Sequence, residues 1–159
     1  MRAARLAWHG QGYVVAGAAT AAVAVQNLAA ESGIASRTVA QWVHRIRHEQ
    51  GLAGIDVLVL DEANLTDDRH RAVLYAAAAD SGTKIVEVGD PRQLRGVGCG
   101  SMFGYLHATL GGPELTDNRR QRCEDERAAL ALYRDGEQLA ALTSLARRGT
   151  GYFRPGLVH

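Results

Sequence analysis

The run of hydrophobic residues at Ile55–Leu60 constrains the fold more than any other segment of this chain. Gly51 and Gly54 precede the run, and Asp61-Glu62 follow it directly. Because it is too short and too continuous for an amphipathic helix, we predict a β-strand that is buried on both faces. A strand of that kind needs helices above and below it, which favours a parallel sheet in an α/β protein.

The rest of the chain alternates between short strands and helical segments. Further strands are predicted at 13–17, 84–88 and 114–116. Helices are predicted at 1–11, 101–110, 125–133 and 137–147. Three more are predicted with their starts marked: one at 21–31 with Thr20 as cap, one from Thr38 onward, and one that runs to 79 from a cap at Thr66 or Asp67. Since strand–helix–strand crossovers are right-handed, this alternation indicates a parallel sheet with helices on both faces.

The composition excludes a secreted disulfide scaffold, a membrane protein and a disordered tail. The chain has 159 residues, 47% of them hydrophobic, and its 18 basic and 17 acidic residues leave a net charge of +1. That length lets a single domain bury a core without metals or disulfides, and the balanced charge signals neither a nucleic-acid nor a membrane partner. Cys99 and Cys123 fit reduced thiols better than a disulfide, and no apolar run reaches the ~20 residues of a membrane span. We therefore expect a cytoplasmic globular domain.

Two predicted strands end in acidic loops, at the edge where parallel sheets bind their ligands. The first loop is Asp61-Glu62-Ala63-Asn64. Four hydrophobic residues followed by Asp-Glu are typical of nucleotide hydrolases, in which the Asp acts on the Mg²⁺ shell and the next carboxylate polarises water. A solvated acidic turn is the alternative explanation.

The second acidic loop is Gly89-Asp90-Pro91-Arg92-Gln93-Leu94. Gly89 permits close backbone approach, and the Gln93 side chain is suited to bond a phosphate oxygen or the lytic water. A common Gly-Asp-Pro turn would give the same residues. The two loops lie about 30 residues apart on strands expected in one sheet, so their combination favours a nucleotide site.

The order of these segments resembles a known family. Asp61-Glu62-Ala63 and Gly89–Leu94 resemble motifs II and III of superfamily 1 DNA helicases of the RecD-like branch, and are most similar to the helicase part of MobF-type conjugative relaxases. Further segments resemble motif Ia (17–22 with 33–39), the glycine-rich continuation of motif III (97–103) and motif IV (114–121). The resemblance covers nearly all of residues 1–147, as a partial RecA-like domain 1A, and leaves 148–159 as a tail.

The resemblance implies an α/β, RecA-like P-loop NTPase fold, with ATP and Mg²⁺ as cofactors and single-stranded DNA as partner. It assigns Asp61 to Mg²⁺ through water, Glu62 to general-base catalysis and Gln93 to sensing the γ-phosphate. Arg120 matches the arginine that stabilises the transition state, and Arg119 is a weaker match. A solvated basic face is the alternative for both arginines. The implied cofactor-binding residues are Asp61, Gly89 and Asp90.

The chain departs from this family at the phosphate loop. It contains no Gly-x-x-Gly-x-Gly-Lys-Ser/Thr stretch, and its single lysine, Lys84, opens a predicted strand. We therefore expect Met1 to fall inside the helix that follows the phosphate loop, and the second RecA-like domain to be missing too. Thr20-Ala21-Ala22 also stand where relatives have Gly-Lys/Arg, which weakens the match to a DNA contact. The chain is thus predicted to be a fragment of an ATP-dependent DNA helicase with negligible ATPase activity of its own.

Two other interpretations stay open. A degenerate helicase domain could serve as a non-enzymatic binding or interaction module, or an unrelated α/β nucleotide-binding protein could carry these acidic loops by coincidence. His44 and His48 have metal-ligand spacing on a helix, but without a third ligand a solvated face is favoured. Trp8, Trp42 and Tyr75 are predicted to pack in the core rather than stack on bases.

Overall fold

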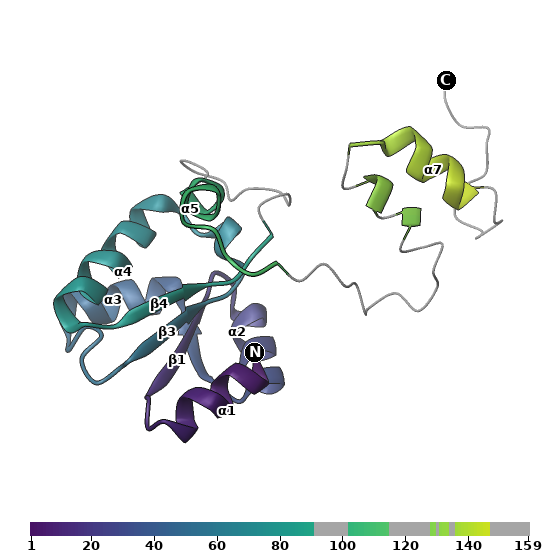
Figure 1. Cartoon of the computed structure of the whole chain (residues 1–159). Coiled ribbons are helices and arrows are strands. Elements are labelled where there is room, and N and C mark those ends of the chain that lie inside the picture. Colours follow the sequence, from purple (N-terminus) through teal and green to yellow (C-terminus); the bar gives the residue numbers. More distant parts are fainter. Residues whose placement is uncertain (91–101, 115–127, 130, 134–135, 147–159) are drawn as a thin grey trace. The chain divides into compact units, whose positions relative to one another are not determined.

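The structure is a computed structural model and describes residues 1–90, 102–114, 128–129, 131–133 and 136–146. The chain forms two compact units, Met1–Gly111 and Gly112–His159. Figure 1 shows the elements of each unit in sequence colours. The first unit holds the sheet and both acidic loops.

The sheet of the first unit has four parallel strands in the order β2-β1-β3-β4. These are β1 (Val15–Ala19), β2 (Ala35–Thr38), β3 (Val57–Leu60) and β4 (Lys84–Glu87). The register places Ala18 beside Leu60, and Leu60 beside Glu87. The strands β1, β3 and β4 therefore end at the same edge of the sheet, and the loops that follow them are neighbours.

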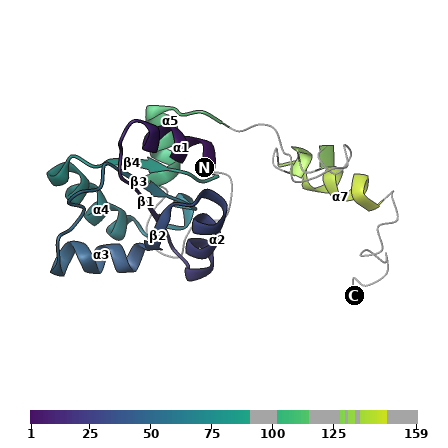
Figure 2. The same ribbon diagram turned by 90° about the horizontal axis from the view of Figure 1, so that it is seen from below.

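Helices connect the strands and cover both faces of the sheet. They are α1 (Arg2–Gly10), α2 (Ala22–Ser32), α3 (Val39–His48), the 3-10 turn η1 (Ala63–Leu65), α4 (Asp68–Ser81) and α5 (Met102–Leu110). The helices α1 and α2 lie on one face, and α3 and α4 lie on the other (Figures 1 and 2). This arrangement confirms the predicted α/β, RecA-like fold.

The core consists of two apolar layers, one on each face of the sheet. Leu58 and Leu60 of β3 pack with Trp42 and Leu74 from α3 and α4, whereas Val57 and Val59 pack with a layer that includes Val15, Ile34 and Trp8. All four residues of β3 are buried, as predicted for this strand. Each such side chain contributes about 1.5–3 kcal/mol of burial free energy, so β3 is a firm support for the loop that follows it.

Side-chain caps fix the starts of α3 and α4. Thr38 accepts a hydrogen bond from the Gln41 backbone N–H, and the Gln41 side chain accepts one from the Thr38 N–H, which completes a capping box. The Asp67 carboxylate accepts a bond from the Arg69 N–H at 2.7 Å, and α4 ends at Gly82 in the left-handed conformation. The predicted start of a helix at Thr38 is confirmed, and of the two predicted caps for α4, Thr66 and Asp67, the structure shows Asp67.

The structure corrects two other predictions and adds one strand. Thr20 does not cap α2, because the N-cap is Ala21 and no side chain bonds the first turn. The first strand begins at Val15 rather than Tyr13, since Tyr13 and Val14 are exposed before the sheet begins. The strand β2 was not predicted, because its sequence Ala-Ser-Arg-Thr lacks the apolar pattern of a buried strand and its residues are at most half-buried.

The second unit is helical over most of its described residues. The helix α7 (Gln138–Ala146) matches the helix predicted at 137–147, and residues 128–129 and 131–133 are helical within the predicted 125–133 segment. The predicted strand at 114–116, beyond Glu114, and the tail at 148–159 lie outside the described residues. The division of the chain at residue 147 stays a prediction. Among the described helices, none has the length and apolar character needed to span a membrane.

Candidate active site at the ends of two adjacent strands

The first residues of the two acidic loops predicted from the sequence meet directly in the structure. The Val88 N–H donates to the Leu60 carbonyl at 2.8 Å, and the Ala63 N–H donates to the Val88 carbonyl at 2.9 Å. The pairing of β3 with β4 thus continues past both strands into the loops. It places Asp61-Glu62 beside Gly89-Asp90 at the carboxyl edge of the sheet, where open α/β sheets bind ligands.

Gly89 is required by this close packing. A Cβ atom at this position would lie 3.0 Å from Asn64 Oδ1, 3.1 Å from Phe103 Cε1 and 3.2 Å from the Ala63 backbone nitrogen. All three contacts are tighter than side chains normally make, so a larger residue would push the two loops apart. The sequence predicted close backbone approach at Gly89, and the structure shows that protein atoms of η1 and α5 make it.

Asp61 and Glu62 differ in how the backbone holds them. Asp61 is half-buried, and its N–H donates to the Ala18 carbonyl of β1 at 2.8 Å. Asp61 Oδ1 accepts a hydrogen bond from the Glu62 N–H at 3.0 Å. Glu62 is exposed and adopts the left-handed conformation, with φ 50° and ψ 43°. The Glu62 carboxylate therefore reaches solvent from a backbone geometry that L-residues disfavour.

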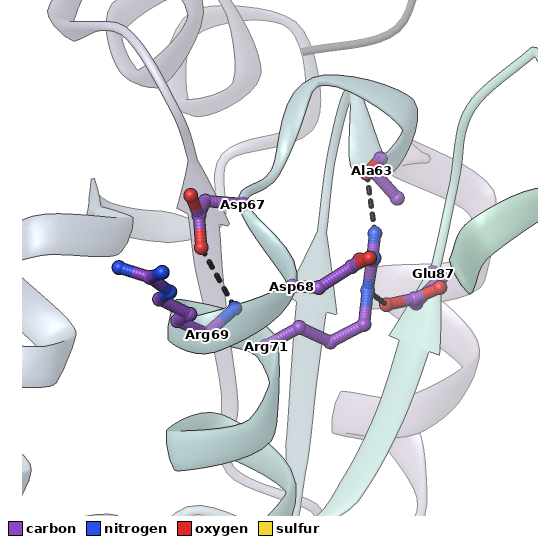
Figure 3. Close-up of polar contacts among 6 residues, drawn as sticks. All are labelled: Ala63, Asp67, Asp68, Arg69, Arg71 and Glu87. Carbon is purple, nitrogen blue, oxygen red and sulfur yellow. Dashed lines mark hydrogen bonds and ion pairs between the residues drawn. The ribbon is translucent and has the colours of Figure 1, made fainter. Parts of the chain in front are cut away.

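A buried arginine lies behind this turn. Arg71 of α4 is only 2% exposed. Its guanidinium donates from Nη2 to the Ala63 carbonyl at 2.5 Å. It also donates from Nε to Glu87 Oε1 at 2.8 Å and from Nη1 to Asp68 Oδ1 at 2.5 Å. Figure 3 shows the guanidinium between the turn after β3 and the end of β4. We call Arg71, Asp68, Glu87 and the Ala63 carbonyl the arginine cluster.

Tyr75 extends the arginine cluster on the next turn of α4. Its pKa is raised above the ordinary 10.0, first by burial and then by the charge of the nearby Glu87 carboxylate. Tyr75 therefore remains neutral at physiological pH.

Sequence reasoning missed the arginine cluster. Two signals were present: Glu87 interrupts the apolar run Ile85-Val86 and Val88, and Asp68 precedes Arg71 by three residues on the same helix. The Glu87 side chain is only 10% exposed, and a charge that is so largely covered needs a partner of opposite sign. Which cation supplies it depends on the packing of α4 against β4, which no local pattern specifies.

The remaining predicted site residues are only partly described. Asp90 directly follows Gly89 and is half-buried, and it makes polar contacts in the structure. Gln93 and Arg120, with Arg119 as its weaker match, lie outside the described residues, as do both cysteines. Their roles stay predictions.

The three aromatic residues singled out in the sequence are buried or half-buried, and the two histidines are exposed. Trp42 is buried, and its indole N–H donates to the Gly17 carbonyl at 2.9 Å, as expected of a core residue. Trp8 and Tyr75 are half-buried. His44 and His48 are exposed with ring centroids 4.7 Å apart, and no group of three or more metal-ligating side chains occurs in the described part of the chain.

The donors at the loop edge fit a magnesium ion held jointly with a nucleotide. Mg²⁺ prefers carboxylate and water oxygens, and proteins usually bind it through one or two carboxylates together with substrate phosphates. Asp61 offers one carboxylate at the end of a rigid strand, beside the exposed carboxylate of Glu62. This donor set suits an ion that keeps several waters and does not suit a cage made by protein alone.

Comparison with known proteins gives the family. Residues 1–151 match the AAA domain family. The chain belongs to this family. It is 40% identical over 125 residues to the probable conjugal transfer protein TraA of Sinorhizobium fredii, which covers 77% of this chain and 11% of that protein.

Two further TraA proteins give the same result. The conjugal transfer protein TraA of Rhizobium radiobacter is 39% identical over 132 residues, covering 81% of this chain and 12% of that protein. TraA of Agrobacterium fabrum is 39% identical over 145 residues, covering 88% and 13%. The predicted relationship to conjugative relaxase-helicases is confirmed. The chain spans little more than a tenth of the length of these relatives.

Proposed function

We propose that this AAA domain chain forms part of an ATP-driven DNA helicase that works in conjugal transfer. The observation that carries the proposal is the hydrogen bond from the Ala63 N–H to the Val88 carbonyl, which brings Asp61-Glu62 and Gly89-Asp90 to one edge of the sheet. Its relatives named conjugal transfer protein TraA supply the context of DNA transfer. The helicase is proposed to move along single-stranded DNA in the cytoplasm.

In this proposal Asp61 holds the metal shell and Glu62 takes the proton from the attacking water. Asp61 is fixed by its N–H bond to β1, whereas the exposed Glu62 carboxylate is free to face a nucleotide above the edge. Gln93 would sense the γ-phosphate and Arg120 would stabilise the transition state. Bound Mg²⁺ would supply charge neutralisation on the phosphate oxygens.

The residues of this chain do not provide a complete nucleotide site. No phosphate loop occurs in the 159 residues, and the single lysine, Lys84, begins β4 at the opposite end from the acidic loops. Backbone N–H groups and a lysine normally cradle the phosphates of a nucleotide in this fold class. We therefore expect the chain alone to hydrolyse ATP at a negligible rate.

Steady-state ATP hydrolysis tests this function. We would compare the 159-residue chain with a fusion that places a phosphate loop of this family before Arg2, each with and without single-stranded DNA. The fusion should hydrolyse ATP, and DNA should stimulate it, whereas the chain alone should not. Glu62→Gln should abolish the turnover, and Asp80→Asn, an exposed carboxylate at the far end of α4, serves as the matched control. Turnover that survives Glu62→Gln would overturn the proposed role of Glu62.

A non-enzymatic role is the second candidate. Thr20-Ala21-Ala22, which stand in place of the family's Gly-Lys/Arg, favour it. In that case the fusion would fold without hydrolysing ATP, and binding of single-stranded DNA by the chain alone would be unchanged by Glu62→Gln. Fluorescence anisotropy with a labelled oligonucleotide measures that binding.

A further inference from the structure

The backbone at Glu62 is strained. Glu62 is the one non-glycine residue with a positive φ in the part of the chain that the structure describes. The left-handed conformation brings the Cβ of an L-residue too close to the neighbouring carbonyl oxygen. Such a residue keeps this geometry only when its surroundings hold it there.

The residue that follows Glu62 is held at both of its backbone polar groups. The Ala63 N–H donates to Val88 O at 2.9 Å, and the Ala63 carbonyl accepts from Arg71 Nη2 at 2.5 Å. Ala63 itself is fully buried. Because Ala63 is fixed on both sides, the chain between Asp61 and Ala63 has little room to relax the strain at Glu62.

Arg71 is a rigid donor for this purpose. The Glu87 carboxylate of β4 and the Asp68 carboxylate of α4 orient its guanidinium, so a planar group with fixed geometry faces the Ala63 carbonyl. Figure 3 shows that the neighbouring Arg69 side chain points away from this cluster. A lysine could keep the charge at position 71 but could not reproduce three directed bonds from one planar group.

We propose that Arg71 is a positioning residue that holds Glu62 in its left-handed conformation through the Ala63 carbonyl. The assignment of a catalytic role to Glu62 rests on the function proposed above. The restraint on the turn itself rests on the geometry of the arginine cluster alone. Arg71 touches neither nucleotide nor water in this scheme, and it acts by fixing the turn from which the Glu62 carboxylate projects.

Amide hydrogen exchange of the 159-residue chain, read residue by residue by NMR, tests this role. Three amides report on the turn: Ala63, Leu65 and Thr66. Two amides report on the opposite ends of the same strands: Val57, which donates to Val14, and Lys84, which donates to Asp56. We expect Arg71→Lys to raise exchange at the turn about tenfold more than at the far ends. Arg69→Lys, on the same helix, should change neither set.

A purely structural role for Arg71 gives a different result. If Arg71 only stabilises the whole fold, exchange at the turn and at the far ends rises by the same factor, and that outcome overturns the proposal. Unchanged exchange at the turn overturns it as well. Since Arg71→Met removes the charge and could unfold the chain, Arg71→Lys and Glu87→Gln are the informative variants.

The strain at Glu62 provides a second, independent readout. Glycine adopts the left-handed conformation without strain, so Glu62→Gly should remove the need for the restraint. We expect Arg71→Lys to have a several-fold smaller effect on Ala63 exchange in the Glu62→Gly background than in the natural chain. Equal effects in both backgrounds would overturn the link between Arg71 and Glu62. Neither readout uses nucleotide, so the exchange measurements decide the role of Arg71. Failure of the fusion to hydrolyse ATP would overturn the proposed function alone.

Discussion

Two loops at the same edge of the sheet are held in opposite ways. The loop after β3 is fixed by backbone bonds to β1 and to Val88 just after β4, by the close approach of Gly89 and by the buried Arg71. The loop after β1 leads into α2 at Ala21 with no side-chain cap. Both follow buried strands, so the strands themselves do not account for the difference.

The two loops differ in the buried polar groups that support them. A charge is rarely buried unless it is paired, and Arg71 is paired with two carboxylates and a carbonyl of the strained turn. A loop that must hold a carboxylate beside a reacting phosphate gains from such restraint, because catalysis of phosphoryl transfer depends on positioning. The loop after β1 has no comparable cluster among the described residues, and the first turn of α2 lacks even a side-chain cap.

Replacing Arg71 should produce the largest effect. Arg71→Met leaves Glu87 and Asp68 without their cation and removes one of the two donors to the Ala63 carbonyl, the other being the Thr66 N–H. We expect a loss of about 3–5 kcal/mol in the free energy of unfolding. Thr20→Ala in the loop after β1 should cost less than about 0.5 kcal/mol. Urea unfolding followed by circular dichroism measures both. Equal losses would remove the contrast between the two loops.

The next effect tests the packing of the two acidic loops. Gly89→Ala places a methyl group within 3.0–3.2 Å of Asn64, Phe103 and Ala63, and should destabilise the fold by about 1–3 kcal/mol. Gly104→Ala in α5 is the control, because nothing lies within 4 Å of a Cβ there and alanine favours helix by about 1 kcal/mol. Thermal unfolding should therefore move in opposite directions for the two variants.

A designed N-cap on α2 tests the same comparison by strengthening the loop after β1. Ala21 has the extended backbone of an N-cap, with φ −110° and ψ 149°, so Ala21→Ser should supply the missing bond and stabilise the chain by about 1 kcal/mol. Removing the existing cap with Thr38→Ala should cost a similar amount. A chain that gains nothing from Ala21→Ser would show that the first turn of α2 is already satisfied by other means.

The smallest expected effect is a pH dependence from Tyr75. Its folded-state pKa is raised, so above about pH 10 the unfolded chain loses this proton while the folded chain keeps it. Stability from this group is therefore complete below the ordinary pKa and declines as the pH rises above it. Unfolding free energies between about pH 9 and pH 11 should fall more steeply for the natural chain than for Tyr75→Phe. Parallel curves would contradict the shift.

Much of the fold followed from local patterns. The β-branched run at β3 predicted a strand buried on both faces. Thr38 marked the start of α3, and cap and glycine residues gave both bounds of α4 to within a few residues. The strand β2 escaped detection, because a strand at the end of the described sheet with at most half-buried residues needs no apolar pattern.

The candidate site was predictable only in part. Asp61, Glu62, Gly89 and Asp90 stood out because strand ends carry function in parallel sheets, and the structure brings them together. The strain at Glu62 was not predictable, because glutamate gives no local preference for positive φ. Arg71 was not predictable either, since its role depends on contacts between α4, β4 and a turn that only the folded chain creates.

The claim that a restrained turn after β3 lets Glu62 act on water is tested most directly by the kinetics of Arg71→Lys in the phosphate-loop fusion. The measurement is kcat and KM for ATP in the presence of single-stranded DNA. We expect kcat to fall at least about tenfold while KM changes less than about twofold, because the turn is loosened and phosphate binding is untouched. An unchanged kcat, with Glu62→Gln still inactive, would contradict the claim.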